Sequence, residues 1–429
     1  MPRTFLPAPV KGMAAGDFPP QQYANIINGF YFGSDGSLIQ SPIWSKMVAY
    51  SSLKFPFRMV RFHFVATSKQ GFLITDWAAK KTWAYYEDGT GWVELLSTTV
   101  PNFPILRPYS SSDDYYVYLT GATVGEFKKA ALNSSSPNPQ QVGISNPSSA
   151  PTATASGTGP LDGYYYFRYT YYNSTLDLES NGSPASSEVS CSSNNVELTD
   201  IEGTGQDGID KIRIYGLGGA ITEYLRIAEI DNPGTGNTTS YTVSTAESEW
   251  SGTLPTNHDA PPDGLWFVDF NPLNGYMFGL TMEGAVSPKI YWSLPWQPDY
   301  WPASNYIDVG EHILALATYR GNTYAFGEHN IYQIVGPRNG QFEARLAVPQ
   351  VGLIMNPALT VSPKGIIFMT KNRNIVVFNG LSVDVLSAPV EEYLKGEEPL
   401  DGKRDYNFFV LNVAKERLFV TLAYVYEEA

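Results

Sequence analysis

Cysteine is almost absent from this chain, since Cys191 is the only one among 429 residues. A single thiol forms no intramolecular disulfide, so we expect a fold that needs no such cross-link and that assembles in a reducing compartment. No run of about twenty apolar residues occurs, which excludes a membrane-spanning helix. The opening "MPRTFLPAPVKGMAAGDFPP" lacks the apolar segment of a secretory signal peptide. These absences predict a soluble protein that does not use the standard export route.

Charged residues are also scarce, at 16% of the chain, whereas aromatic residues reach 14% and include 29 tyrosines. The chain contains 38 glycines and 31 prolines. Few charges, many β-forming aromatics and many turn formers are typical of an all-β protein built from short strands.

The formal net charge is −14, and no Lys- or Arg-rich run occurs. Tight DNA binding by neutralisation of phosphates is therefore not expected. An acidic surface serves solubility, and it also suits a wall past which DNA slides without binding.

Motifs that carry catalysis or hold metals are missing. The four histidines are far apart, and HExxH, CxxC and GxSxG do not occur. The stretch "DIEGTGQDGIDK" offers four carboxylates, but their spacing does not match a regular calcium loop, and we interpret it as a solvated turn; they are Asp200, Glu202, Asp207 and Asp210. We therefore predict no enzyme activity, no metal and no cofactor.

Composition divides the chain into four parts. Residues 1–57 resemble an N-terminal arm and entry strand, and residues 58–132 alternate strands with turns. Residues 133–260 begin with a linker rich in Ser, Pro, Thr and Gly and continue with about seven short strands, typical of a fibronectin- or immunoglobulin-like β-sandwich. Residues 261–429 resume the first pattern. Acidity is concentrated in the inserted part, because residues 145–250 contain 14 acidic and 4 basic side chains.

A repeat runs through residues 261–429, the last of these four parts. Gly275, Gly321 and Gly365 each open a strand–turn–strand unit, at separations of 46 and 44 residues. Four short strands in about 45 residues make the blade of a β-propeller. The sequence outside the insertion suffices for a propeller of about six blades, and we expect a strand near Asn28 to complete the last blade.

Three of the nine tryptophans lie within ten residues, in "IYWSLPWQPDYWPASNYIDVG". Trp292, Trp296 and Trp301 fall on the connection between two expected blades. Their rings are candidates for packing at the seam between blades, for stacking against a ligand such as a sugar, or for contact with another subunit. The sequence favours seam packing and leaves the other two open.

The same segment, "KIYWSLPWQPDYWPASNYIDVGEHILALATYRGNTYAFGEHNIYQIVG", resembles a recurring segment of tail nozzle proteins, the tubular tail proteins of short-tailed bacteriophages. "VGLIMNPALTVSPKGIIFMTKNRNIVVFNGLSVDVLSAPVEEYL" and "ANIINGFYFGSDGSLIQSPIWSKM" resemble two further phrases of that family, although Pro42 is followed here by Ile43 and not by Gly. The resemblance rests on short phrases spread over about two thirds of the chain. An inserted fibronectin-like module also occurs in that family.

The resemblance implies a structural virion protein of the phage tail, assembled in the host cytoplasm. Its copies, usually six, would form a ring that extends the tail channel, contacts the tail adaptor and fibre proteins, retains the genome and passes DNA during ejection without tight binding. The alternative is a carbohydrate-binding or glycan-cleaving propeller, because 42 acidic residues leave room for a catalytic carboxylate pair. The absence of Asp-box repeats counts against that alternative.

Overall fold

The regular structure of the chain is β throughout, apart from two short 3-10 turns, η1 (Glu247–Glu249) and η2 (Asn356–Ala358). The computed structural model describes residues 30–32, 38–40, 56–64, 69–76, 81–97, 105–108, 115–120, 127–133, 137–281, 289–338, 340–388, 408–414 and 417–423. The prediction of an all-β protein is confirmed. Over these residues, no helix has the length and apolar character needed to cross a membrane.

Five four-stranded antiparallel sheets follow one another along the chain, with strands in each sheet ordered as in the sequence. They are β3 (Pro56–Phe64), β4 (Lys69–Asp76), β5 (Lys81–Tyr86) and β6 (Gly91–Ser97); β7 (Ile105–Pro108), β8 (Tyr115–Leu119), β9 (Lys128–Ala131) and β10 (Gln140–Gln141); β17 (Leu265–Phe270), β18 (Met277–Thr281), β19 (Ile290–Trp292) and β20 (Tyr306–Ile307); β21 (Ile313–Tyr319), β22 (Asn322–Gly327), β23 (Ile331–Arg338) and β24 (Gln341–Val348); β25 (Leu359–Ser362), β26 (Gly365–Met369), β27 (Ile375–Phe378) and β28 (Val383–Val385).

Local sequence explains these sheets. In the hairpin between β21 and β22, Arg320 and Gly321 both have positive φ, at 50° and 78°, as a two-residue turn requires. The second strands β18 and β26 are buried along their whole length, because each is covered by a neighbouring sheet on both faces. Their sequences, "MFGLT" and "GIIFM", are accordingly almost entirely apolar.

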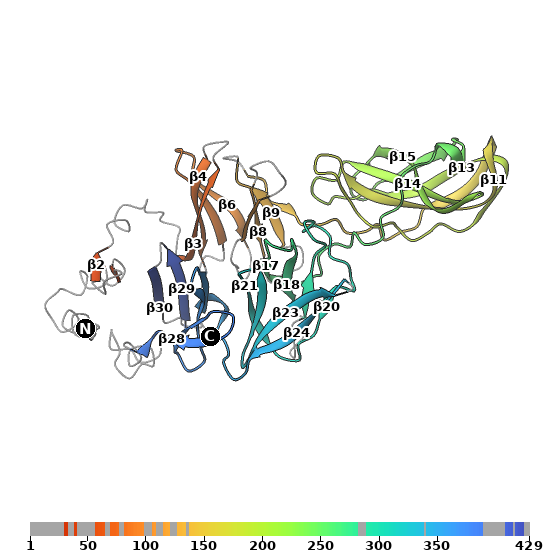
Figure 1. Cartoon of the computed structure of the whole chain (residues 1–429). Coiled ribbons are helices and arrows are strands. Elements are labelled where there is room, and N and C mark those ends of the chain that lie inside the picture. Colours follow the sequence, from red (N-terminus) through yellow and green to blue (C-terminus); the bar gives the residue numbers. More distant parts are fainter. Residues whose placement is uncertain are drawn as a thin grey trace, which may run out of the picture.

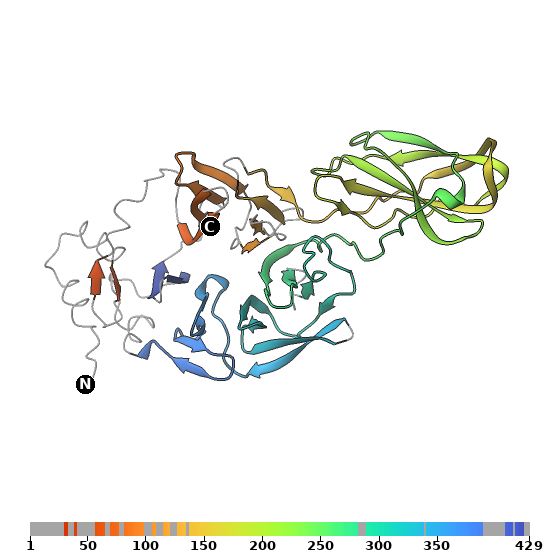
Figure 2. The same ribbon diagram turned by 45° about the horizontal axis from the view of Figure 1, so that its top comes forward.

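The first strands of the sheets lie side by side around a closed path (Figure 2). β17 contacts β7 and β21, β21 contacts β25, β25 contacts β29 (Phe408–Ala414), and β29 contacts β3. The path is closed between the first two sheets by a shared core, which includes Leu73, Ala84, Val117 and Leu119. This is the arrangement of a β-propeller.

Two hairpins lie where the ring returns to its start. β29 pairs with β30 (Arg417–Ala423), and β1 (Phe30–Phe32) pairs with β2 (Leu38–Gln40). β1 also contacts β30. The N-terminal segment that was expected to complete the last blade therefore lies against the last hairpin.

A separate β module is inserted between the second and third sheets and projects to one side of the propeller (Figure 1). Its strand order is β15-β14-β11-β13-β16, with β12 beside β11. The strands are β11 (Thr152–Asn173), β12 (Leu178–Glu179), β13 (Val189–Glu202), β14 (Lys211–Gly218), β15 (Ile221–Asp231) and β16 (Thr238–Val243). The long strand β11 pairs first with β13 and then with β14, so one strand belongs to both halves of the module.

The expected boundary of the insertion at residue 133 differs from the structure. β10, at Gln140–Gln141, is the outer strand of the second propeller sheet, and Val142 is buried against propeller residues. The Ser/Pro-rich segment is therefore not a free linker over its whole length. A short polar strand such as "QQ" carries too little apolar pattern to be recognised in the sequence.

Candidate functional site

Trp301 lies between the second and third propeller sheets. Its side chain is 2% exposed and belongs to a core formed by residues of both sheets. The ring of Phe127 meets it edge to face at 6.1 Å, and the indole N–H donates to the carbonyl of Pro298 at 2.8 Å. Both the apolar ring and the polar nitrogen are satisfied inside the protein, which leaves this tryptophan no surface for a ligand.

Trp292 occupies the next seam, between the third and fourth sheets. It is fully buried, and its ring packs edge to face on Phe342 of β24 at 5.1 Å. Phe278 of β18 packs on the same phenylalanine at 5.0 Å. These rings bury a large apolar area where two sheets meet.

Trp296 differs from the other two, because 59% of its side chain is exposed. Its φ of 62° places it in the left-handed region, which is uncommon for a bulky residue. The ring lies directly over Gly275, where an added Cβ would come within 2.5 Å of it, and it meets Phe270 edge to face at 6.1 Å. Of the three tryptophans for which seam packing was predicted, two are therefore buried and one is exposed to solvent.

A buried ion pair links the second and third sheets beside Trp301. Lys129 of β9 donates to both carboxylate oxygens of Asp299, at 2.8 and 2.7 Å, and both side chains are almost fully buried, at 0% and 2% exposure. The backbone N–H of Gly143 donates to the same carboxylate at 2.9 Å. No pattern in the sequence indicates this pair, because its members are 170 positions apart and neither lies in a recognisable motif.

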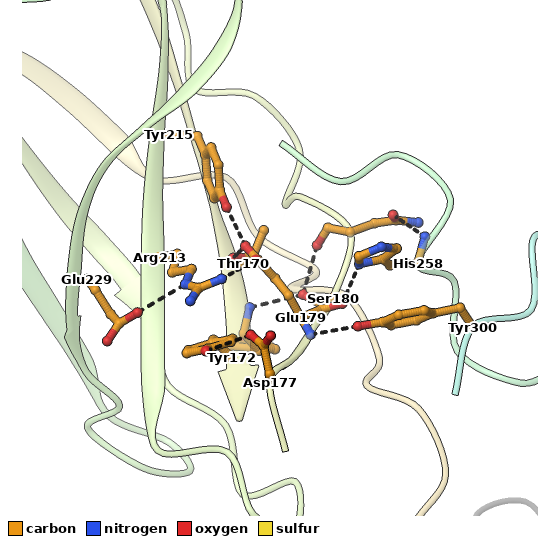
Figure 3. A network of polar contacts seen from close by, with 12 residues as sticks. Thr170, Tyr172, Asp177, Glu179, Ser180, Arg213, Tyr215, Glu229, His258 and Tyr300 are labelled. Atoms are coloured by element: carbon orange, nitrogen blue, oxygen red, sulfur yellow. Dashed lines mark hydrogen bonds and ion pairs between the residues drawn. The ribbon is translucent and has the colours of Figure 1, made fainter. Parts of the chain in front are cut away.

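The inserted module is attached to the propeller by a second set of contacts (Figure 3). The hydroxyl of Tyr300 accepts a hydrogen bond from the backbone N–H of Glu179 at 3.1 Å, and the ring of His258 stacks on Tyr300 at 3.8 Å. His258 Nδ1 donates to the Glu179 carbonyl at 3.0 Å. Burial lowers the pKa of His258 and raises the pKa of Tyr300 to about 12.

Inside the module, the Glu179 carboxylate receives three donors (Figure 3). Thr170 donates at 2.7 Å, Arg213 at 2.6 Å, and the Tyr215 hydroxyl donates to the same oxygen as Thr170. Arg213 also bonds Glu229 at 3.0 Å, and burial raises the pKa of Tyr215. These bonds join β11, β12 and β14 through one carboxylate, so Glu179 has a structural role inside the module.

Hydrogen bonds from Ser174, on the β11–β12 turn, hold the acidic loop that was considered for calcium. The Asp210 carboxylate accepts bonds from the Ser174 backbone N–H at 2.8 Å and from its hydroxyl at 2.5 Å, and these bonds lower the pKa of Asp210. Across the part of the chain that the structure describes, no three His, Cys, Asp or Glu side chains are grouped to hold a metal ion.

Comparisons with known proteins give no family. No family model matches the chain, and no curated protein matches it. Among solved structures, the chain is similar to YCF48 from Cyanidioschyzon merolae, with 9% identity, a TM-score of 0.33 and coverage of 86% of this chain and 95% of that one. It is also similar to apo AztD from Citrobacter koseri, with 13% identity, a TM-score of 0.29 and coverage of 77% and 85%. A third is BBS1N in complex with ARL6DN, at 9% identity, a TM-score of 0.31 and coverage of 79% and 86%.

Proposed function

We propose that this protein is a structural component of a bacteriophage tail, a nozzle protein whose copies form a ring, about six in number, around the channel for DNA. One observation carries the proposal: the sheets form a ring, and two of the three tryptophans in the Trp-rich segment are buried between neighbouring sheets. The phrase that resembles nozzle proteins spans β19 to β23, and its residues Trp292 and Trp301 fill the seams on either side of the third sheet.

The proposal includes a finer description of the fold. Five four-stranded sheets, together with the β29–β30 and β1–β2 hairpins at the point of closure, make a propeller of six blades. The inserted module, with its own apolar core and the long strand β11 shared by two halves, is a fibronectin-like β-sandwich. In this arrangement the propeller builds the tube, and the sandwich projects from it as a docking arm.

DNA would pass through such a ring without tight binding. Residues 145–250 carry −10 of the net charge of −14, so the rest of the chain carries −4, and it has no Lys- or Arg-rich run. A weakly acidic tube wall without such a run would not hold the phosphate backbone of a moving duplex. The tail adaptor would receive the ring at one end, and the fibre proteins would attach around it. We therefore propose that the chain has no catalytic role and resides in the virion.

The test is to delete the gene from the phage that encodes it and to image the particles by negative-stain electron microscopy. We expect heads that lack the distal tail tube and that lose their genome, and supply of the protein from a plasmid should restore both. Particles that keep a complete, genome-retaining tail without this protein would refute the proposal.

Exposure of Trp296 favours a second candidate function, carbohydrate binding. An open indole is a stacking platform for a sugar ring, and Gln297 beside it is exposed and polar. Glycan-array binding that disappears in Trp296→Ala, with unchanged thermal unfolding, would support this candidate. No binding above background by the wild-type chain would remove it.

A further inference from the structure

An apolar and cationic surface lies on the turns at one end of the propeller sheets. We call it the turn face and define it by Leu273 on the β17–β18 turn, Trp296 on the β19–β20 loop, Arg320 on the β21–β22 turn and Lys364 on the β25–β26 turn. Leu273 and Trp296 are 74% and 59% exposed, and both cations are exposed as well. Such large apolar side chains in the open mark a contact surface.

The turn face is continuous across three sheets. Leu273 packs on Gly321, where an added Cβ would come within 2.0 Å of its side chain, and Arg320 precedes that glycine. Arg320 in turn lies over the ring of Tyr319 at 5.1 Å. The Tyr319 hydroxyl donates to the carbonyl of Pro363 at 3.2 Å, next to Lys364.

Charge on the turn face is opposite to that of the whole protein. The turns that form it, residues 272–275, 294–298, 320–321 and 363–364, contain no Asp or Glu, whereas the chain carries a net charge of −14. Turns that carry two cations, Trp and Leu but no carboxylate fit a partner that is acidic and has an exposed aromatic side chain.

The inserted module has such a surface at its free end. Tyr164 is 61% exposed, and its carbonyl accepts a hydrogen bond from the turn that joins β14 to β15, at Gly219. Carboxylates surround this end: three on exposed residues are Asp162, Glu223 and Glu249. We call these residues and Tyr164 the acidic tip. The attachment to the propeller, through Tyr300, lies beside Tyr172 near the C-terminal end of β11, eight residues along the strand from Tyr164.

We propose that the acidic tip of one copy docks on the turn face of a second copy. Tyr164 would cover the apolar pair Leu273 and Trp296, and the carboxylates would meet Arg320 and Lys364. The tip extends away from its own propeller (Figure 1), and the buried contacts at the junction hold it there, so the occupant is another chain. The inference rests on the proposed ring-forming function, because a head-to-tail contact between unlike surfaces is what closes a ring of identical subunits.

The test is sedimentation velocity of the full chain over a range of concentrations at low and high salt. We expect self-association that weakens as salt rises, since exposed charge pairs are screened. Arg320→Glu combined with Lys364→Glu should weaken association at least tenfold, as should Glu223→Lys combined with Glu249→Lys. An equimolar mixture of the two variants should associate again through the two reversed surfaces. Arg345→Glu, a single charge reversal on the outer strand β24, is the control and should associate like the wild type.

A wild-type chain that stays monomeric at every soluble concentration overturns the inference, as does a turn-face variant that associates like the Arg345→Glu control. Circular dichroism and thermal unfolding verify that the variants are folded. Protection of Trp296 by a glycan or by DNA, without self-association, would assign the face to another occupant. The two proposals fail separately: particles that need the protein but assemble with the reversed turn face refute only the docking, and docking in a chain absent from virions refutes only the tail function.

Discussion

Replacing Asp299 by alanine is the sharpest test of how the second and third sheets are held together. The substitution leaves the Lys129 ammonium, which is fully buried, without its carboxylate, and it removes the acceptor of the Gly143 N–H. Removal of one partner of a buried ion pair costs about 3–5 kcal/mol. We expect Asp299→Ala to lower the free energy of unfolding of the propeller by an amount in that range.

We attribute the expected loss of stability to the buried charge of Lys129 without its carboxylate. A double variant separates this effect of charge from the effect of lost packing. Lys129→Met removes the cation and keeps its volume, and Asp299→Asn keeps an oxygen that accepts from Gly143. The combined variant has neither charge buried, so we expect it to be at least about 1 kcal/mol more stable than Asp299→Asn alone.

The assay is urea unfolding followed by tryptophan fluorescence and by far-UV circular dichroism. Two probes are needed, because a propeller and an inserted module need not unfold in one transition. Trp250 reports on the core of the module, and Trp301 lies beside the ion pair. If Asp299→Ala unfolds within about 1 kcal/mol of the wild type, the buried charge is not what holds this seam, and the reasoning is refuted.

The remaining predictions concern one packed ring and two ionisable side chains. Trp301→Ala should lower the free energy of unfolding by about 3–5 kcal/mol in the same urea titration. Hydrogen bonds from His312 and Lys371 lower the pKa of Glu328 to about 2. Its contribution to stability is therefore complete above its unfolded pKa near 4.5 and is lost as pH falls toward 2. An acid titration of Glu328→Gln should lack this loss. Burial lowers the pKa of His258 below its ordinary 6.5, so the unfolded state binds the proton more readily and stability falls as pH drops below that value. His258→Asn should remove this slope below about pH 6.5.

Matched controls accompany these variants. Trp296→Ala removes the same side chain from an exposed position and should cost less than about 1 kcal/mol. A loss for Trp301→Ala as small as the loss for Trp296→Ala would show that Trp301 is not a packing residue. An acid titration of Glu328→Gln that coincides with the wild type, or a His258→Asn chain that keeps its slope near pH 6, would assign the pH dependence to other groups.

Much of the propeller was predictable because its signal is local. Short apolar strands between Gly-containing turns at Gly275, Gly321 and Gly365 recur with the spacing of a four-stranded sheet, and each of these glycines has positive φ in the structure. The backbone geometry of a tight turn selects glycine at the same place in each repeat, which makes the period visible in one sequence.

The junction was not predictable, because each of its contacts joins positions that are distant in sequence. Asp299 meets Lys129, and Tyr300, one residue later, meets Glu179, 121 positions away. No spacing rule relates these pairs, since an inserted module separates Lys129 from Asp299. Only the sharp bend of the loop among its prolines brings two adjacent residues to two different parts of the molecule.

The three tryptophans mark the limit of the sequence argument most clearly. All lie among prolines in ten residues, and composition gives them the same environment. What separates them is the backbone: the left-handed φ of Trp296 turns its ring over Gly275 and outward, whereas Trp292 sits on a regular strand and points into the seam. A residue of this size adopts that conformation at a cost in strain, and the fold gains little burial from it. For this reason Trp296, and not its two buried neighbours, is the tryptophan that we assign to the proposed turn face.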